Sequence, residues 1–192
     1  MKNKFVQAAL TLVVAFGASA FTTENNETKE VDVKTSKVTW KGYKVTGSHE
    51  GTIALQKGSL IFDGDQLTGG EFVVDMTSIS STDLEGENKD NLDGHLKSDD
   101  FFGIGTHPTA SMAFTKVKPA GKNAYEVTAD LTVKGKTHPV TFELSVYGNK
   151  ATGAVKIDRT KYDVRYGSGS FFDNLGDKTI YDEFDLVVDL NF

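Results

Sequence analysis

The sequence contains no cysteine among its 192 residues. This absence excludes disulfide bonds, so burial and hydrogen bonding must stabilise the fold unaided. It also excludes a lipid-modified N-terminal cysteine and cysteine ligands for a metal. Basic residues are fewer than acidic ones, 21 against 27, which leaves a net charge of −6. Because an acidic surface repels phosphate backbones, the composition argues against nucleic acid as a partner.

Long apolar runs are also missing, apart from one close to the N-terminus. Two lysines precede an apolar segment over 5–16, and an A-x-A site ends at Ala20. This order is typical of a secretory signal peptide over residues 1–20 that is cleaved after Ala20. An uncleaved anchor would need about 20 apolar residues, and charge resumes at Glu24. We therefore expect an exported protein, periplasmic or extracellular, with no membrane span after cleavage.

The rest of the chain has the organisation of a single domain. We expect residues 21–30 to be a flexible lead-in and residues 31–192 to form one barrel domain, because no repeat or second domain is visible. Apolar and polar residues alternate along most of this region, which is typical of half-buried strands. Such runs, separated by turn signals, occur at 31–44, 51–62, 71–78, 110–117, 125–134, 141–148, 151–159 and 183–192.

Eight strands with mostly short connections predict an all-β, antiparallel fold. The strands could close into a barrel or split into a sandwich. Strands of ten residues or more favour an eight-stranded barrel, which is either filled by side chains or holds one small ligand. Two segments, 82–107 and 162–178, break the alternation and are expected to be a short helix with its loop and a flap.

The first irregular segment is predicted to contain a short helix. Leu92 and Leu96 are four residues apart and would share one face of a helix that begins near Asp83 or Glu85. A turn that starts at Ser98 would end this helix. The aromatic pair that follows it would then plug one mouth of the barrel.

His95 lies in this predicted helix and has three possible roles. It could pair with Asp99 as acid and base, but no G-x-S-x-G nucleophile signature accompanies it. His95 and His107 are too far apart in sequence for paired metal ligands. We therefore expect no enzyme, no metal and no cofactor, and interpret His95 as a hydrogen-bonded structural residue that could contact a ligand headgroup.

The second irregular segment has a glycine–serine tip over 167–170 and an aromatic pair, Phe171 and Phe172. This composition suits a flap over an opening, although an ordinary surface loop would look the same. Arg159, just before it, could receive a polar headgroup. An ion pair with the adjacent Asp158 at the strand end is the other interpretation of this arginine.

The inward face of the predicted strands is apolar and carries no acid or base. Such a face suits a long apolar chain, since each buried methylene contributes about 0.8 kcal/mol. The same side chains could instead fill one another's space as a dry core. Alternation does not report cavity volume, so from alternation alone the dry core is the favoured interpretation. Trp40 and Tyr43 are expected to be core anchors. The candidate lining residues are Phe72, Phe101, Phe102, Phe114, Leu131, Val133, Phe142, Leu144, Phe184, Leu186 and Val188.

Five stretches together resemble the YceI-like family, the bacterial exported lipid- or polyisoprenoid-binding proteins. In order they are "VTWKGYKVTGSHEGTI", "GGEFVVDMTSIS", "LDGHLKSDDFFGIGTHPTASMAF", "YEVTADLTVKGKTHPVTF" and "VKIDRTKYDVRYG". The resemblance implies a lipocalin-like barrel that is hollow and holds a hydrophobic small molecule, an isoprenoid, quinone or fatty-acyl lipid, as a carrier or scavenger.

The resemblance leaves two other functions open. One is a ligand-free, structural or stress-related exported barrel, and the other is an enzyme that acts on a lipid through His95. The sequence is also compatible with a homodimer.

Overall fold

The computed structural model describes residues 26–192. The predicted signal peptide over 1–20, its cleavage site at Ala20 and the first half of the predicted lead-in lie outside the described residues. Within 26–192, no helix has both the length and the apolar character needed to cross a membrane.

The described chain forms nine strands, one α-helix and two short 3₁₀ turns. The strands are β1 (Asn26–Glu30), β2 (Lys37–Lys44), β3 (Gly47–Asp63), β4 (Gln66–Ser81), β5 (Thr109–Gly121), β6 (Ala124–Val133), β7 (Lys136–Tyr147), β8 (Lys150–Asp158) and β9 (Ile180–Asn191). Helix α1 (Gly86–Lys97) lies between β4 and β5, and the turns η1 (Arg159–Tyr162) and η2 (Gly176–Lys178) lie between β8 and β9.

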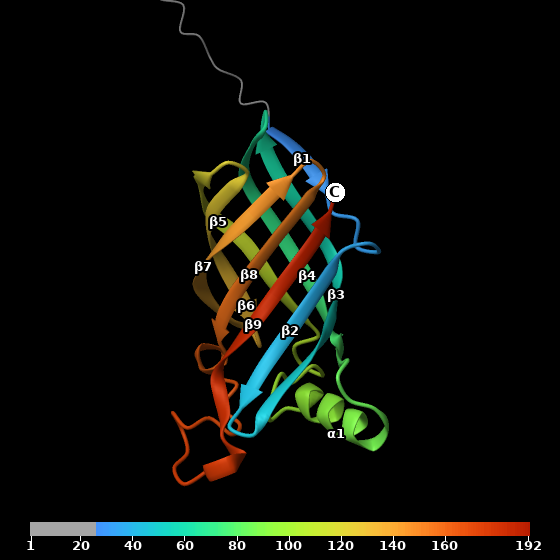
Figure 1. Ribbon diagram of the computed structural model, residues 1–192, viewed down its shortest axis with the longest axis vertical. Helices are drawn as coiled ribbons and strands as arrows, with labels where there is room; N and C mark the ends of the chain where they lie inside the picture. The colour runs from blue at the N-terminus through green and yellow to red at the C-terminus, as the bar shows by residue number, and fades with distance from the viewer. Residues whose placement is uncertain (1–25) are drawn as a thin grey trace, which may run out of the picture.

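Eight of these strands close a tall antiparallel barrel (Figure 1), as the alternation predicted. The strand order is β3-β2-β9-β8-β7-β6-β5-β4, and β4 pairs with β3 to complete the circle. Strand β1 is the ninth and pairs only with β3, from Asn26 opposite Asp63 to Glu30 opposite Ser59. Because every strand of the barrel has two neighbours, closure leaves no full-length edge exposed.

The sequence prediction for the region before the barrel is wrong in part. Residues 26–30 form strand β1 rather than a flexible lead-in. The predicted strand over 31–44 is interrupted by a turn over 31–36, in which the amide of Lys34 donates to Asp32 Oδ1 at 2.9 Å. The reason is long-range: β3 is 17 residues long, and its edge beyond β2 is paired by β1. The side chains of β1 are polar and mostly exposed, so the sequence has no apolar–polar alternation there that would predict a strand.

Helix α1 lies across one end of the barrel and is attached to β4 by Asp93 (Figure 1). Asp93 accepts hydrogen bonds from the Ser81 amide at 2.6 Å and the Ser80 hydroxyl at 2.7 Å, and pairs with Lys89 at 3.0 Å. Burial raises the pKa of this carboxyl, but the hydrogen bonds outweigh burial and bring it to about 2. The helix ends at Lys97, and the hydroxyl of the following residue, Ser98, donates to the His95 carbonyl at 2.8 Å.

Candidate ligand-binding cavity

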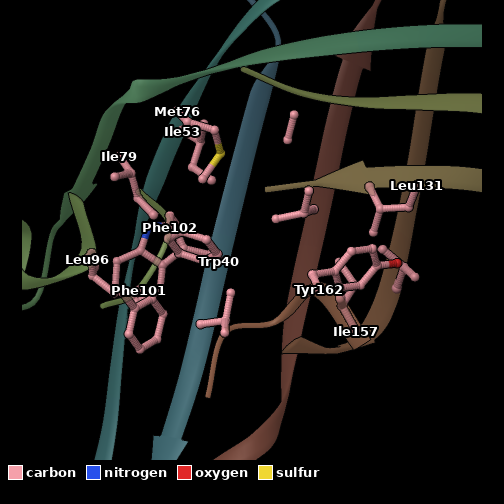
Figure 2. Close-up of a cluster of buried hydrophobic side chains, with 14 residues drawn as sticks. Trp40, Ile53, Met76, Ile79, Leu96, Phe101, Phe102, Leu131, Ile157 and Tyr162 are labelled. Carbon is pink, nitrogen blue, oxygen red and sulfur yellow. The ribbon is translucent and has the colours of Figure 1, made fainter. Parts of the chain in front are cut away.

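The barrel interior contains two groups of packed apolar side chains. The upper group, away from α1, includes Leu60 and Val127, both with no exposed area. The lower group includes Ile79 and Val164 and contacts the helix and the loop that follows it. Figure 2 shows part of the lower group, with side chains converging from several strands on the barrel interior.

A cavity of about 160 Å³ lies within the barrel. A water molecule needs roughly 10–15 Å³ on a comparable measure, so the space is far larger than a packing defect. The wall is apolar almost throughout. Among residues 26–192, Ser111 is its only hydroxyl-bearing side chain and Arg159 its only charged one. Such a cavity favours an apolar ligand with few polar groups.

All eleven apolar residues that the sequence analysis selected line this cavity. Nine come from strands β4, β5, β6, β7 and β9, where their alternation points them inward, and two come from the loop after α1. They are Phe72, Phe101, Phe102, Phe114, Leu131, Val133, Phe142, Leu144, Phe184, Leu186 and Val188.

Several of the inward aromatic rings line the space without filling it. Phe72, Phe114, Phe142 and Phe184 point into the barrel, yet each keeps part of its surface exposed. Phe114 packs against the rings of Phe72 and Phe142, with centroids 5.7 and 6.0 Å apart along the wall. The dry-core interpretation that alternation alone favoured is therefore wrong for the middle of this barrel.

The sequence analysis missed other residues of the wall. Ile53, Met76, Val155 and Ile157 also line the cavity. They lie in runs that the analysis had already recognised as strands, so extending the same alternation to those runs would have found them. Trp40, predicted as a core anchor, is 7% exposed and both packs in the lower group and lines the cavity.

The loop after α1 places an aromatic plug at the lower end of the cavity. The Phe101 and Phe102 side chains are 7% and 9% exposed, and their rings meet edge to face at 5.0 Å. Lys134, in the β6–β7 turn, donates from Nζ to the carbonyls of Asp99 and Phe101, each at 2.9 Å. The plug is therefore attached to the barrel by the hydrogen bonds of the Lys134 side chain as well as by packing.

His95 contacts aromatic rings rather than polar groups. Its ring lies 5.4 Å from that of Phe101 and 4.3 Å from that of Tyr166, between centroids. Its Nε2 atom is buried without a hydrogen-bond partner, which corrects the expectation of a hydrogen-bonded histidine. No hydrogen bond or ion pair joins its side chain to Asp99 among the described residues, and His95 does not line the cavity.

Arg159 is a buried cation at the lower end of the cavity. It is 3% exposed and donates to the carbonyls of Val164 at 2.7 Å, Ile180 at 3.0 Å and Tyr181 at 3.0 Å. Its guanidinium lies 5.6 Å from the centroid of the Phe101 ring. Burial lowers its pKa, which the nearby Asp182 and Asp158 partly oppose.

The ion partner of Arg159 differs from the predicted one. The adjacent Asp158 instead accepts from the amide and hydroxyl of Thr160, at 3.0 and 2.5 Å, and so begins the turn η1. Arg159 pairs with Asp182 on β9, at a distance of 3.8 Å. Sequence adjacency suggested the wrong acid because the chain folds back over 23 residues to bring Asp182 to this arginine.

The segment between β8 and β9 projects from the lower end of the barrel, as the orange-red loop in Figure 1 shows. Arg159 anchors its two ends, but Phe171 and Phe172 near its tip are exposed.

Tyr43 corrects another prediction: it is not a core anchor. It lies on the outer face of β2, and its hydroxyl donates to Asp185 at 2.6 Å.

Comparison with known proteins identifies the type of domain. Residues 30–192 match the model of the YceI-like domain. A UPF0312 protein of Vibrio parahaemolyticus is 29% identical over 150 residues, which span 71% of this chain and 75% of that protein. A UPF0312 protein of Pseudomonas putida is also 29% identical, over 77% of this chain and 74% of its own.

Solved structures share the barrel. BcnA of Burkholderia cenocepacia superposes with a TM-score of 0.65 at 25% identity, covering 83% of this chain and 98% of its own. A polyisoprenoid-binding domain of Saccharophagus degradans superposes with a TM-score of 0.60 at 14% identity, covering 84% and 95%. At that identity the second similarity concerns the fold alone.

Proposed function

Because this chain belongs to the YceI-like family, we propose that its barrel binds a lipid with a long apolar chain and a small polar head. The observation that carries this proposal is the apolar cavity, whose inward rings leave space instead of filling it. An apolar chain in that space gains roughly 0.8 kcal/mol for each methylene removed from water. The Saccharophagus degradans domain, described as polyisoprenoid-binding, makes an isoprenoid the first chain to test.

The position of Arg159 supports one orientation of the ligand. A guanidinium has five N–H donors, and the three carbonyl bonds of Arg159 use three of them. The remaining donors belong to a buried cation in a wall whose other described residues are uncharged. We propose that the head lies beside Arg159, near the plug, and accepts hydrogen bonds, as a quinone carbonyl, carboxylate or phosphate would.

The same geometry supports a carrier or scavenger rather than an enzyme. His95 lies outside the cavity against two rings, and no acid among the described residues is bonded to its side chain. General acid–base chemistry needs such a group within hydrogen-bond reach of the substrate. If any lipid turnover is found, its persistence in His95→Ala would exclude His95 as its source.

Native mass spectrometry of protein purified without detergent tests the proposal. We expect a bound species that adds a lipid mass to the chain and that organic extraction recovers. A ligand-free spectrum, with no uptake of an added quinone or isoprenoid, would instead indicate a structural barrel without a ligand.

A paired substitution tests the proposed head position. Replacing Arg159 by Met should lower retention of lipids with an acceptor head, whereas Arg165→Met, which changes an exposed arginine, should not. Melting temperatures of both variants separate lost binding from lost folding. Equal retention by the two folded variants would contradict the proposed orientation.

A further inference from the structure

The exposed large apolar side chains of this protein are concentrated at one end of the barrel. Of the eight in the described residues, five lie on the β2–β3 hairpin or between Tyr166 and Tyr181. We call this set the apolar rim; its members are Val45, Tyr166, Phe171, Phe172 and Tyr181. Figure 1 shows the hairpin and the β8–β9 loop at the same end as α1.

The rim residues belong to one connected piece of structure. The Val45 amide donates to the Thr179 carbonyl at 3.1 Å, which joins the hairpin to the end of the β8–β9 loop. The Ile180 amide donates to the Gly167 carbonyl at 2.8 Å, which closes the loop on itself. Ile180 also lines the cavity, so the rim lies directly beside the lower end of the proposed binding site.

The chain contains two Phe-Phe dipeptides, and their different burial shows that the rim is not part of the core. Phe101 and Phe102 are 7% and 9% exposed, whereas Phe171 and Phe172 are 44% and 50% exposed. The turn that carries the second pair is well held, because both of its amides donate to the carbonyl of the fully buried Ser168. The backbone therefore presents these two rings to the outside, where they contribute little to folding.

The charges around the rim differ from those of the whole chain. Residues 161–178 carry three basic and three acidic side chains, in a protein with a net charge of −6. The guanidinium of Arg165 lies 4.8 Å from the centroid of the Phe171 ring, its side chain is 56% exposed, and its Nε pairs with Asp163 Oδ1 at 2.5 Å. A guanidinium has further N–H donors beyond Nε, which can bind a lipid phosphate while the aromatic ring beneath the cation enters the bilayer.

We propose that the apolar rim docks this protein on a phospholipid bilayer. Amphipathic aromatic side chains with adjacent cations are the composition that proteins use at the membrane interface. A cargo with a long apolar chain resides in bilayers, so a docking surface beside the cavity shortens its path through water. The choice of a bilayer as partner rests on the proposed function, whereas the exposure and the clustering of the rim do not.

Vesicle flotation tests this inference with a matched control. Wild-type protein should float with vesicles of phosphatidylethanolamine and phosphatidylglycerol. Phe171→Ala/Phe172→Ala should reduce the floating fraction about tenfold or more, since binding scales with buried apolar area. The control is Tyr147→Ala, which removes an aromatic residue that is 61% exposed and ends β7, the strand whose arrow points away from α1 in Figure 1. This variant should float as the wild type does. Arg165→Gln should weaken binding most on vesicles rich in phosphatidylglycerol.

The lipid content by native mass spectrometry and the self-association of the protein, measured beside flotation, separate the possible failures. Wild-type protein that stays below the vesicles, or a double variant that floats equally well, overturns docking even if native mass spectrometry finds lipid in the cavity. Rim-dependent flotation of a barrel that takes up no lipid supports docking and overturns the proposed function. In a third outcome, the wild type self-associates without binding vesicles, and the double variant abolishes that self-association. This result would assign the rim to a second copy of the chain and overturn the proposal that it docks on a bilayer.

Discussion

Leu131 is the residue at which a hollow barrel and a packed barrel differ most clearly. It is 5% exposed, lies close to the end of β6 and lines the cavity. Leu131→Phe adds bulk without polarity, so the cavity should absorb the ring with little loss of stability while lipid occupancy falls. Thermal melting and mass spectrometry of extracted lipid measure the two effects.

The same substitution at Leu60 is the control for Leu131. Leu60 is fully buried in the upper apolar group and does not line the cavity. Overpacking there should cost about 1–3 kcal/mol. If Leu131→Phe destabilises the protein as much as Leu60→Phe, and the wild type binds no lipid, then the space at Leu131 is not a binding cavity.

Single residues also show where sequence adjacency misleads. Arg159 follows Asp158, but its ion partner is Asp182 on the neighbouring strand. Tyr43 stands three residues after the buried Trp40, and this odd spacing in a strand places it on the outer face. The period of two was visible in the sequence, whereas the ion partner depended on the pairing of β8 with β9.

Among the elements, helix α1 is attached to β4 through the carboxylate of Asp93, besides the packing of Leu96. The pKa of Asp93 is lowered from 3.8 to about 2 in the folded protein. Its stabilisation is therefore fully present above about pH 4 and is lost as the pH falls towards 2. Integrated over that interval it amounts to about 2 kcal/mol.

Replacing Asp93 by Asn should remove this stabilisation. We expect the variant to unfold at lower urea concentration at pH 7, by about 2 kcal/mol, and the difference from wild type to shrink below about pH 3. Asp90→Asn, an exposed position on the same helix, should change stability by less than about 0.5 kcal/mol. A pH-independent loss in Asp93→Asn would show that its charge does not hold the helix.

The plug is the second element whose contribution can be measured. Phe101→Ala/Phe102→Ala should cost about 3–5 kcal/mol for each ring and should loosen lipid retention if the double variant still folds. The identical change at the exposed pair Phe171 and Phe172 should leave the unfolding free energy within about 0.5 kcal/mol of wild type. Equal melting of the two double variants would mean that Phe101 and Phe102 do not seal the barrel.

For the whole molecule, the N-terminal segment predicts where the mature protein begins. We expect export and cleavage after Ala20, so that secreted protein starts at Phe21. N-terminal sequencing or the intact mass of protein from the cell envelope or medium checks this. A chain that still begins at Met1 would refute the signal peptide.

The sequence alone determined the strands of this barrel and part of the wall of its cavity. Alternation with a period of two is a local property of extended backbone, so it identified the inward positions, and all eleven selected apolar residues line the cavity. The short helix was equally local, because two leucines four residues apart and a terminating serine are close in the chain. The order of five motifs was enough to indicate the family.

The tertiary structure decided what the wall encloses and what its ends present. Cavity volume depends on how far strands distant in sequence stand from one another, and no local period encodes that distance. The two Phe-Phe pairs are identical as sequence, but one meets the lower apolar group and the other meets no core surface. Burial is a property of the contacts that closure creates, so only the closed barrel separates a plug from an exposed rim.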